Sequence, residues 1–169
     1  MLLQDALGTA IDYEHRVRDH YADAARKATD PVAQRVFAIL AREEQGHVEY
    51  LEARLQEWKT TGVVKAVELK SILPDAAQVQ QAVQKAPKGV PATPVAKAEI
   101  DFLKEALELE RTTSAFYQSL VAQLEPVHKP LFARFLEIEE GHVTIVQAEI
   151  DAIAGHGHWF DFMEFRLEA

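Results

Sequence analysis

The stretch FAILAREEQGHV at residues 37–48 has a counterpart in FARFLEIEEGHV at residues 132–143, and the two stretches are identical at six positions. Both contain a glutamate that precedes a histidine by three residues, a spacing that puts the two side chains on one face of a helix. A matching repeat precedes each copy, since a shift of 96 residues aligns Ala10, Glu14 and Tyr21 with Ala106, Glu110 and Tyr117. The chain is therefore predicted to be an internally duplicated helical hairpin.

Apolar residues around these copies recur every three or four positions, which is the period of one face of an α-helix. The pattern predicts four long helices, at about residues 3–28, 31–60, 95–124 and 127–154. The breaks beside Pro31 and Pro126 are short, so consecutive helices pair into two hairpins. The connection at about residues 61–94 contains a predicted short helix at 75–85 and is long enough to run the height of a bundle. We expect an all-α four-helix bundle with one long crossover between the second and third long helices.

The composition limits the possible functions. The chain has 169 residues, the size of one domain, and no cysteine, which excludes disulfides, zinc–thiolate sites, iron–sulfur clusters and thiol catalysis. Its formal net charge of −9 argues against nucleic-acid binding. No apolar run approaches the ~18 residues of a membrane span, and the first residues lack the basic start of a signal peptide. The expected compartment is therefore the cytoplasm.

The end of the chain differs in character from the rest. We assign residues 1–155 to the bundle and residues 156–169 to an aromatic tail, which contains Trp159, Phe160, Phe162 and Phe165. We expect this tail to pack on one end of the bundle or on a partner chain. Because the aromatic tail and the proline-rich connection are the surfaces expected at an interface, a homodimer or small homo-oligomer is predicted.

Each apolar stripe is interrupted where an apolar residue is due. The interrupting residues are Glu14 in the first helix, Glu44 and His47 in the second, Glu110 in the third, and Glu139 and His142 in the fourth. Folding each hairpin at its break places the glutamates of its two helices at one height. The sequence therefore predicts that four carboxylates and two imidazoles point into one level of the core.

Four carboxylates cannot lie together in a low-dielectric core without compensation, because desolvation and mutual repulsion both oppose their charge. Two divalent metal ions would neutralise them, and each ion would take one histidine. Buried ion pairs are the alternative interpretation. A third glutamate–histidine pair with the same spacing, Glu125 and His128, spans Pro126 at a helix start and has no counterpart in the repeat, so we exclude it.

Four further residues lie near the predicted ligands in the sequence, and their positions indicate a role less specifically. Tyr21 and Tyr117 each lie seven residues beyond an inward glutamate, two turns along the same face. They are either core aromatics only, or they hydrogen-bond a ligand carboxylate or pass an electron to the metals. Glu43 and Glu140 adjoin predicted ligands and are expected on a helix flank or in solvent.

The paired motifs at Glu44–His47 and Glu139–His142, together with Glu14 and Glu110, resemble the ferritin-like di-iron carboxylate proteins, and among them the rubrerythrins. The resemblance covers about residues 1–155. It implies two iron ions per chain, with manganese or mixed occupancy as alternatives. It also implies that Glu44 and Glu139 bridge the ions, that Glu14 and Glu110 bind one ion each, and that His47 and His142 cap one ion each.

The resemblance implies a redox enzyme that reduces hydrogen peroxide or dioxygen in oxidative-stress defence; the alternatives are a ferroxidase for iron handling and an inert scaffold. Rubrerythrins usually carry a four-cysteine rubredoxin-like domain, which this chain lacks, so an external electron-donor protein is expected. They also often have an extra glutamate where this chain has Thr113. The resulting set of four glutamates and two histidines is similar to that of bacterioferritins, which oxidise Fe²⁺.

Overall fold

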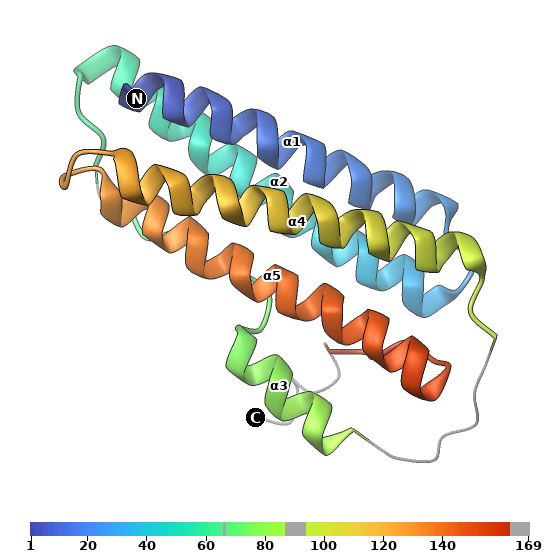
Figure 1. Cartoon of the computed structure of the whole chain (residues 1–169). Coiled ribbons are helices and arrows are strands. Elements are labelled where there is room, and N and C mark those ends of the chain that lie inside the picture. Colours follow the sequence, from blue (N-terminus) through green and yellow to red (C-terminus); the bar gives the residue numbers. More distant parts are fainter. Residues whose placement is uncertain (66, 87–93, 163–169) are drawn as a thin grey trace.

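The computed structural model describes residues 1–65, 67–86 and 94–162, and in these residues it contains five helices and no strand (Figure 1). The prediction of an all-α fold is therefore confirmed. The long helices are α1 (Leu3–Lys27), α2 (Pro31–Thr61), α4 (Lys97–Gln123) and α5 (Lys129–His156), and the short helix is α3 (Ala76–Lys85). No helix in the described residues is both long and apolar enough to cross a membrane.

Helix ends follow from local sequence. Asp30 caps α2 by accepting hydrogen bonds from the backbone N–H groups of Val32 and Ala33, at 2.7 and 3.3 Å, and Pro31 occupies the first helical position. Asp75 and Gln78 form a reciprocal capping box at the start of α3. Gly62 and Gly157 end α2 and α5 with φ of 71°, a conformation that favours glycine.

The predicted helix bounds agree with the structure to within two residues, and the start of the last long helix shows why they differ. The last long helix begins at Lys129 and not near residue 127, because a turn closed by the hydrogen bond from His128 N to Glu125 O, at 2.9 Å, precedes it. Pro130, near the start of the helix, needs no backbone partner there. The proline that marks the helix start is therefore Pro130, whereas Pro126 lies in the turn.

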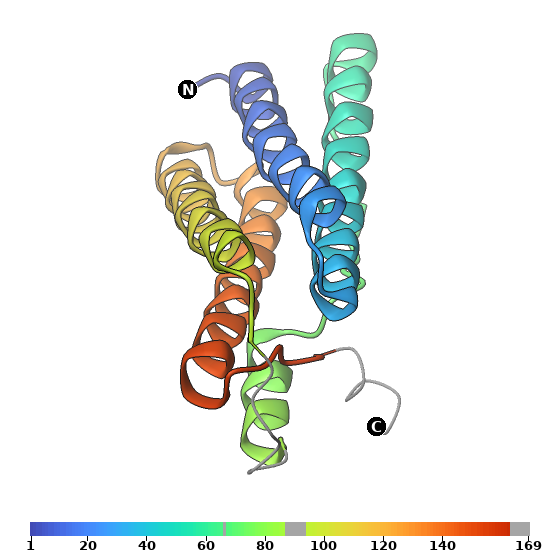
Figure 2. The ribbon, with the colours of Figure 1, turned by 90° about the vertical axis from the view of Figure 1, so that its right-hand side faces the viewer.

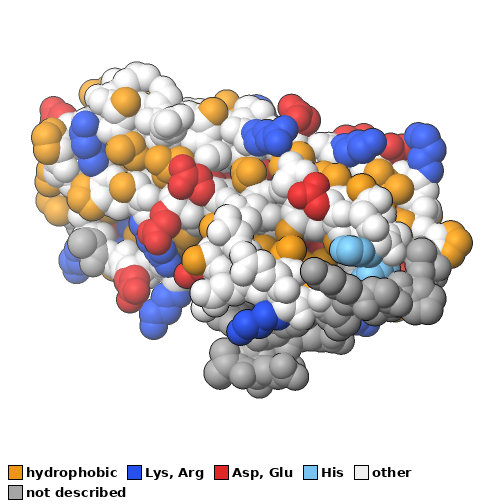
Figure 3. All heavy atoms as spheres, turned by 60° about the horizontal axis from the view of Figure 1, so that its bottom comes forward, with side chains coloured by type: hydrophobic (Ala, Val, Ile, Leu, Met, Phe, Trp, Pro, Cys, Tyr) orange, Lys and Arg blue, Asp and Glu red, His pale blue; other side chains and the backbone are white. Residues whose placement is uncertain are grey.

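The long helices form two antiparallel hairpins, α1 with α2 and α4 with α5, and α1 also packs on α4 (Figures 1 and 2). The helices α2 and α4 run in the same direction, so the connection between them returns along the length of the bundle. On its way this connection forms α3, which packs on α5. On the face that carries α3, acidic and basic side chains are interspersed among the described residues, with no patch of one sign (Figure 3).

Within the part of the chain that the structure describes, the apolar core forms two clusters. One contains Leu7, Leu51, Tyr117, Phe132 and Phe135, and the other contains Val17, Tyr21, Phe37, Leu40 and Trp159. All of these side chains are buried. Since the predicted ligands fall between the two sets along each helix, the bundle has an apolar layer on either side of a polar level.

The described part of the tail packs on the bundle. Trp159, Phe160 and Phe162 are buried, and the Trp159 ring meets Phe37 of α2 edge to face, with centroids 5.5 Å apart. The backbone N–H of Phe160 donates to Oε2 of the buried Glu149 at 2.8 Å. These contacts join the end of α5 to the start of α2. Residues 163–169, which include Phe165 of the predicted tail, lie outside the described residues.

Candidate metal centre

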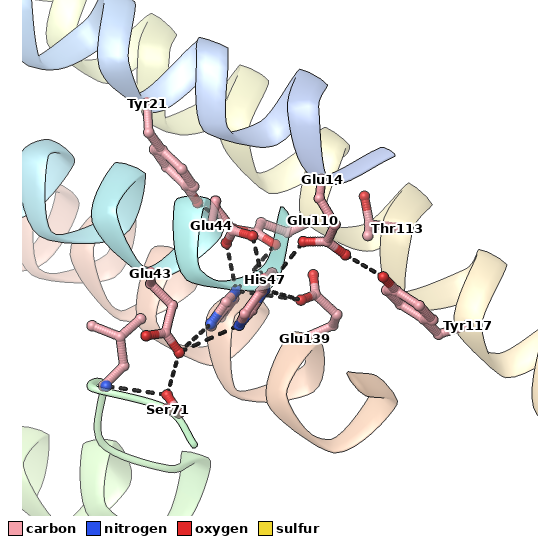
Figure 4. Close-up of polar contacts among 12 residues, drawn as sticks. Glu14, Tyr21, Glu43, Glu44, His47, Ser71, Glu110, Thr113, Tyr117 and Glu139 are labelled. Atoms are coloured by element: carbon pink, nitrogen blue, oxygen red, sulfur yellow. Dashed lines mark hydrogen bonds and ion pairs between the residues drawn. The ribbon is translucent and has the colours of Figure 1, made fainter. Parts of the chain in front are cut away.

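The six predicted ligands come together in one buried space between α1, α2, α4 and α5 (Figure 4). Each has no more than 1% of its surface exposed. Glu14 comes from α1, Glu110 from α4, and each of the other two helices contributes a glutamate and a histidine: Glu44 and His47 from α2, and Glu139 and His142 from α5. Helical periodicity produces this meeting, because residues three apart project from one face.

The Nδ1 atom of His47 faces three carboxylates. It lies 3.1 Å from Oε2 of Glu14, 3.1 Å from Oε2 of Glu44 and 3.5 Å from Oε1 of Glu139. These four residues can hold a metal ion, because one ligand atom from each lies within 4.8 Å of the others. Carboxylate and imidazole donors of this kind suit divalent first-row metals.

The Nδ1 atom of His142 faces a second, overlapping set. It lies 2.9 Å from Oε1 of Glu44, 3.7 Å from Oε2 of Glu110 and 3.7 Å from Oε1 of Glu139. Glu44, Glu110 and His142 also satisfy the distance condition for a metal ion. Glu44 and Glu139 therefore face both histidines, whereas Glu14 and Glu110 face one each.

The protein alone compensates this site through histidine–carboxylate ion pairs and leaves much of its hydrogen-bonding capacity unused. Several buried polar atoms have no hydrogen-bond partner among the described residues: both carboxylate oxygens of Glu44 and of Glu139, Oε2 of Glu110, and Nδ1 of His142. Buried polar atoms without partners are rare in proteins because each costs about 1–3 kcal/mol. Cations held by the two overlapping sets would be partners for these atoms, so the donors fit divalent metal ions.

Burial and charge shift the proton affinities of the metal-free site. Burial raises the pKa of Glu14 to about 7 and that of Glu139 well above its ordinary value. Although burial opposes their charge, nearby carboxylates raise the pKa of His47 and His142 well above the ordinary value. The metal-free site therefore retains protons near neutral pH, and metal binding must release them.

The two tyrosines each reach across to the other hairpin. The Tyr21 hydroxyl of α1 donates to Oε1 of Glu110 on α4, and the Tyr117 hydroxyl of α4 donates to Oε1 of Glu14 on α1. Both rings are fully buried. Of the alternatives left open by the sequence, the structure supports the one in which the tyrosines hydrogen-bond the carboxylates of predicted ligands.

The expectation for Glu43 is wrong. Its side chain is 3% exposed and points toward the histidine pair instead of toward solvent (Figure 4). It accepts hydrogen bonds from the Ser71 hydroxyl and from the backbone N–H of Ile72, both in the connection after α2. The spacing from Glu43 to His47 is one helical turn and could have indicated this orientation, but no sequence pattern indicates Ser71 as a partner. Glu140 is exposed, as predicted.

A cavity of about 180 Å³ opens beside the centre. It lies between the connection and α5, and its lining includes Ser71, Gln78, Glu137, Gly141 and His142. The side of the site that Glu43 and Ser71 occupy therefore adjoins a cavity.

Neither a family model, a curated protein nor a solved structure matches this chain. The interpretation of the site therefore rests on its own geometry.

Proposed function

We propose that the chain is a ferritin-like di-iron protein of the rubrerythrin type, which reduces hydrogen peroxide or dioxygen. The observation that supports this most strongly is the distribution of carboxylates around the two Nδ1 atoms. Two glutamates face both histidines and two face one each, as a pair of ions with shared and unshared ligands requires.

In this proposal Glu44 and Glu139 would be shared by the two ions, Glu14 and His47 would complete one ligand set, and Glu110 and His142 would complete the other. The four negative charges balance two divalent cations, which removes the repulsion among the buried carboxylates. The hydroxyls of Tyr117 and Tyr21 hold Glu14 and Glu110, so each unshared ligand is fixed by a hydrogen bond from the opposite hairpin.

When bound, a ferrous pair supplies two electrons, which with two protons convert one hydrogen peroxide molecule into two water molecules. The surrounding apolar layers keep bulk water from the site and strengthen its electrostatic interactions. These 169 residues cannot bind a thiolate-ligated electron carrier, because none of them is a cysteine. The electrons that restore the ferrous state therefore come from an external donor protein.

Metal content and rapid mixing test this proposal. We expect about two iron ions per chain in protein from iron-replete cells, and oxidation of two ferrous ions by each peroxide molecule through repeated cycles of re-reduction. Fewer than one metal ion per chain, unaltered in the His47→Ala/His142→Ala double variant, would contradict the site. If neither peroxide nor dioxygen oxidises the iron in the loaded protein, the proposed activity is wrong and the metal serves only to stabilise the fold.

A ferroxidase that handles iron is the second candidate, and Thr113 favours it. This residue stands one turn after Glu110, is buried, and donates its hydroxyl to Leu109 O at 2.9 Å. Its side chain therefore adds no fifth carboxylate on the Nδ1 side of the histidines, and the symmetric set resembles that of bacterioferritins. Addition of excess Fe²⁺ separates the two candidates, because accumulation of many ferric ions per chain is expected only for iron storage.

A further inference from the structure

Glu43 lies on the outer side of the histidine pair, away from the four predicted ligand carboxylates. Its Oε1 atom is 3.5 Å from Nε2 of His47 and 3.7 Å from Nε2 of His142. The two imidazole rings stack in parallel, with centroids 5.4 Å apart and an interplanar angle of 2°. One carboxylate oxygen therefore faces the same atom of both rings.

The connection between α2 and α3 holds this carboxylate in place. The Ser71 hydroxyl donates to Oε1 of Glu43, and the backbone N–H of Ile72 donates to Oε2 at 2.9 Å (Figure 4). The Ser71 hydroxyl in turn accepts a hydrogen bond from the backbone N–H of Leu73 at 3.1 Å. Both oxygens of Glu43 thus have donors from a segment that supplies none of the six predicted ligands.

A neutral histidine that binds a metal through one ring nitrogen carries a proton on the other, and that N–H needs an acceptor. Among the described residues, the Nε2 atoms of His47 and His142 make no hydrogen bond in the metal-free site, and Glu43 is the carboxylate within ion-pair distance of both Nε2 atoms. We propose that Glu43 is a positioning residue that accepts the Nε2–H of both histidines. Both Nδ1 atoms are then free to bind metal.

This assignment rests on the proposed dinuclear site and adds an asymmetry to it. The repeat places Ile138 opposite Glu43, so the second hairpin has no equivalent carboxylate. A single side chain therefore orients the histidine of each hairpin. Because Ser71 and Ile72 hold that side chain, the connection controls the affinity for both metal ions together.

Zinc binding to the full-length metal-free protein tests the proposal, since Zn²⁺ needs no redox chemistry and permits NMR. We expect Glu43→Gln to weaken Zn²⁺ binding 10- to 100-fold, because the amide cannot accept two N–H groups equally well. Ser71→Ala should weaken binding less, and the double variant should be no weaker than Glu43→Gln alone. The control Glu140→Gln removes an exposed carboxylate next to Glu139 and should leave the affinity unchanged.

In the zinc-loaded wild type, ¹H–¹⁵N correlation spectra should show both histidines protonated at Nε2 and metal-bound at Nδ1. Protonation at Nδ1, or equal Zn²⁺ affinity in wild type and Glu43→Gln, would overturn the role of Glu43 while leaving the dinuclear site intact. Failure of the wild type to bind two zinc ions, or unchanged binding of two zinc ions by the His47→Ala/His142→Ala double variant, would overturn the site itself. If Glu43→Gln does not fold, unchanged zinc affinity in Ser71→Ala would still overturn the proposal.

Discussion

A single tyrosine hydroxyl can provide the hydrogen bond that a buried glutamate needs. The Tyr117 hydroxyl is the donor that reaches Oε1 of Glu14 across the bundle. Tyr117→Phe removes this donor and leaves a buried carboxyl oxygen without it, so the free energy of unfolding of the metal-free protein should fall by about 1–3 kcal/mol. Urea denaturation followed by circular dichroism measures this change.

The matched control for that substitution is Tyr13→Phe. The Tyr13 ring is only half-buried and stacks on Phe116, with centroids 4.4 Å apart, so loss of its hydroxyl should change stability by less than about 0.5 kcal/mol. Equal losses in the two variants would show that the buried hydroxyl has no special role.

The protonation of Glu14 gives the metal-free protein a distinct pH dependence. Its pKa is raised from 4.5 to about 7, so the folded state binds more protons than the unfolded state in that window. Stability is therefore greatest below pH 4.5 for this group and is lost as pH rises through 7, by at most roughly 3 kcal/mol. The raised pKa values of Glu139 and of the two histidines act in the same direction.

Thermal melting of chelator-treated protein between pH 5 and 8 tests this dependence. We expect the melting temperature to fall as pH rises through this range, and Glu14→Gln to flatten the curve because its amide does not titrate. A melting temperature that rises steadily from pH 5 to 8 would mean that the carboxyl groups are solvated.

At the scale of helices, the sequence predicted a residue's environment correctly wherever the apolar repeat of its own helix determines that environment. The four long helices and the inward direction of Glu44 and His47 belong to this class, because an apolar stripe determines which face is buried. The contacts of Glu43 with Ser71 and Ile72 could not be predicted in this way, because the connection has no repeating sequence pattern that indicates its path. The partner of each tyrosine was likewise hidden, because it lies on a helix of the other hairpin.

The contact between the tail and α2 can be tested through Trp159. Its side chain is 7% exposed and packs against Phe37, so Trp159→Ala should lower the free energy of unfolding by about 3–5 kcal/mol. The control is Trp58→Ala, because Trp58 is half-buried near the other end of the bundle. Equilibrium denaturation should show the larger loss for Trp159, and a larger loss for Trp58 would indicate that the tail contributes little to the fold.

At the scale of the whole molecule, metal and fold should depend on each other. The two apolar clusters supply a core without metal, so the metal-free protein should remain folded at neutral pH. Metal removal should nevertheless lower the melting temperature, because ligands that bind only the folded state stabilise it. Calorimetry with and without chelator measures the difference, and the difference should vanish in the His47→Ala/His142→Ala double variant. Equal melting temperatures in the wild type would contradict metal binding to the folded state.

The crossed hydrogen bonds from Tyr21 to Glu110 and from Tyr117 to Glu14 relate the two hairpins as near-equivalent halves. Each hairpin donates one tyrosine hydrogen bond to a glutamate of the other. Two separate copies of one ancestral hairpin could therefore have formed such a centre by pairing about a twofold axis. Fusion of the copies into one polypeptide removes the requirement that both halves stay alike. The difference between Glu43 and Ile138 is a divergence of this kind, which a symmetric pair of identical chains could not have acquired.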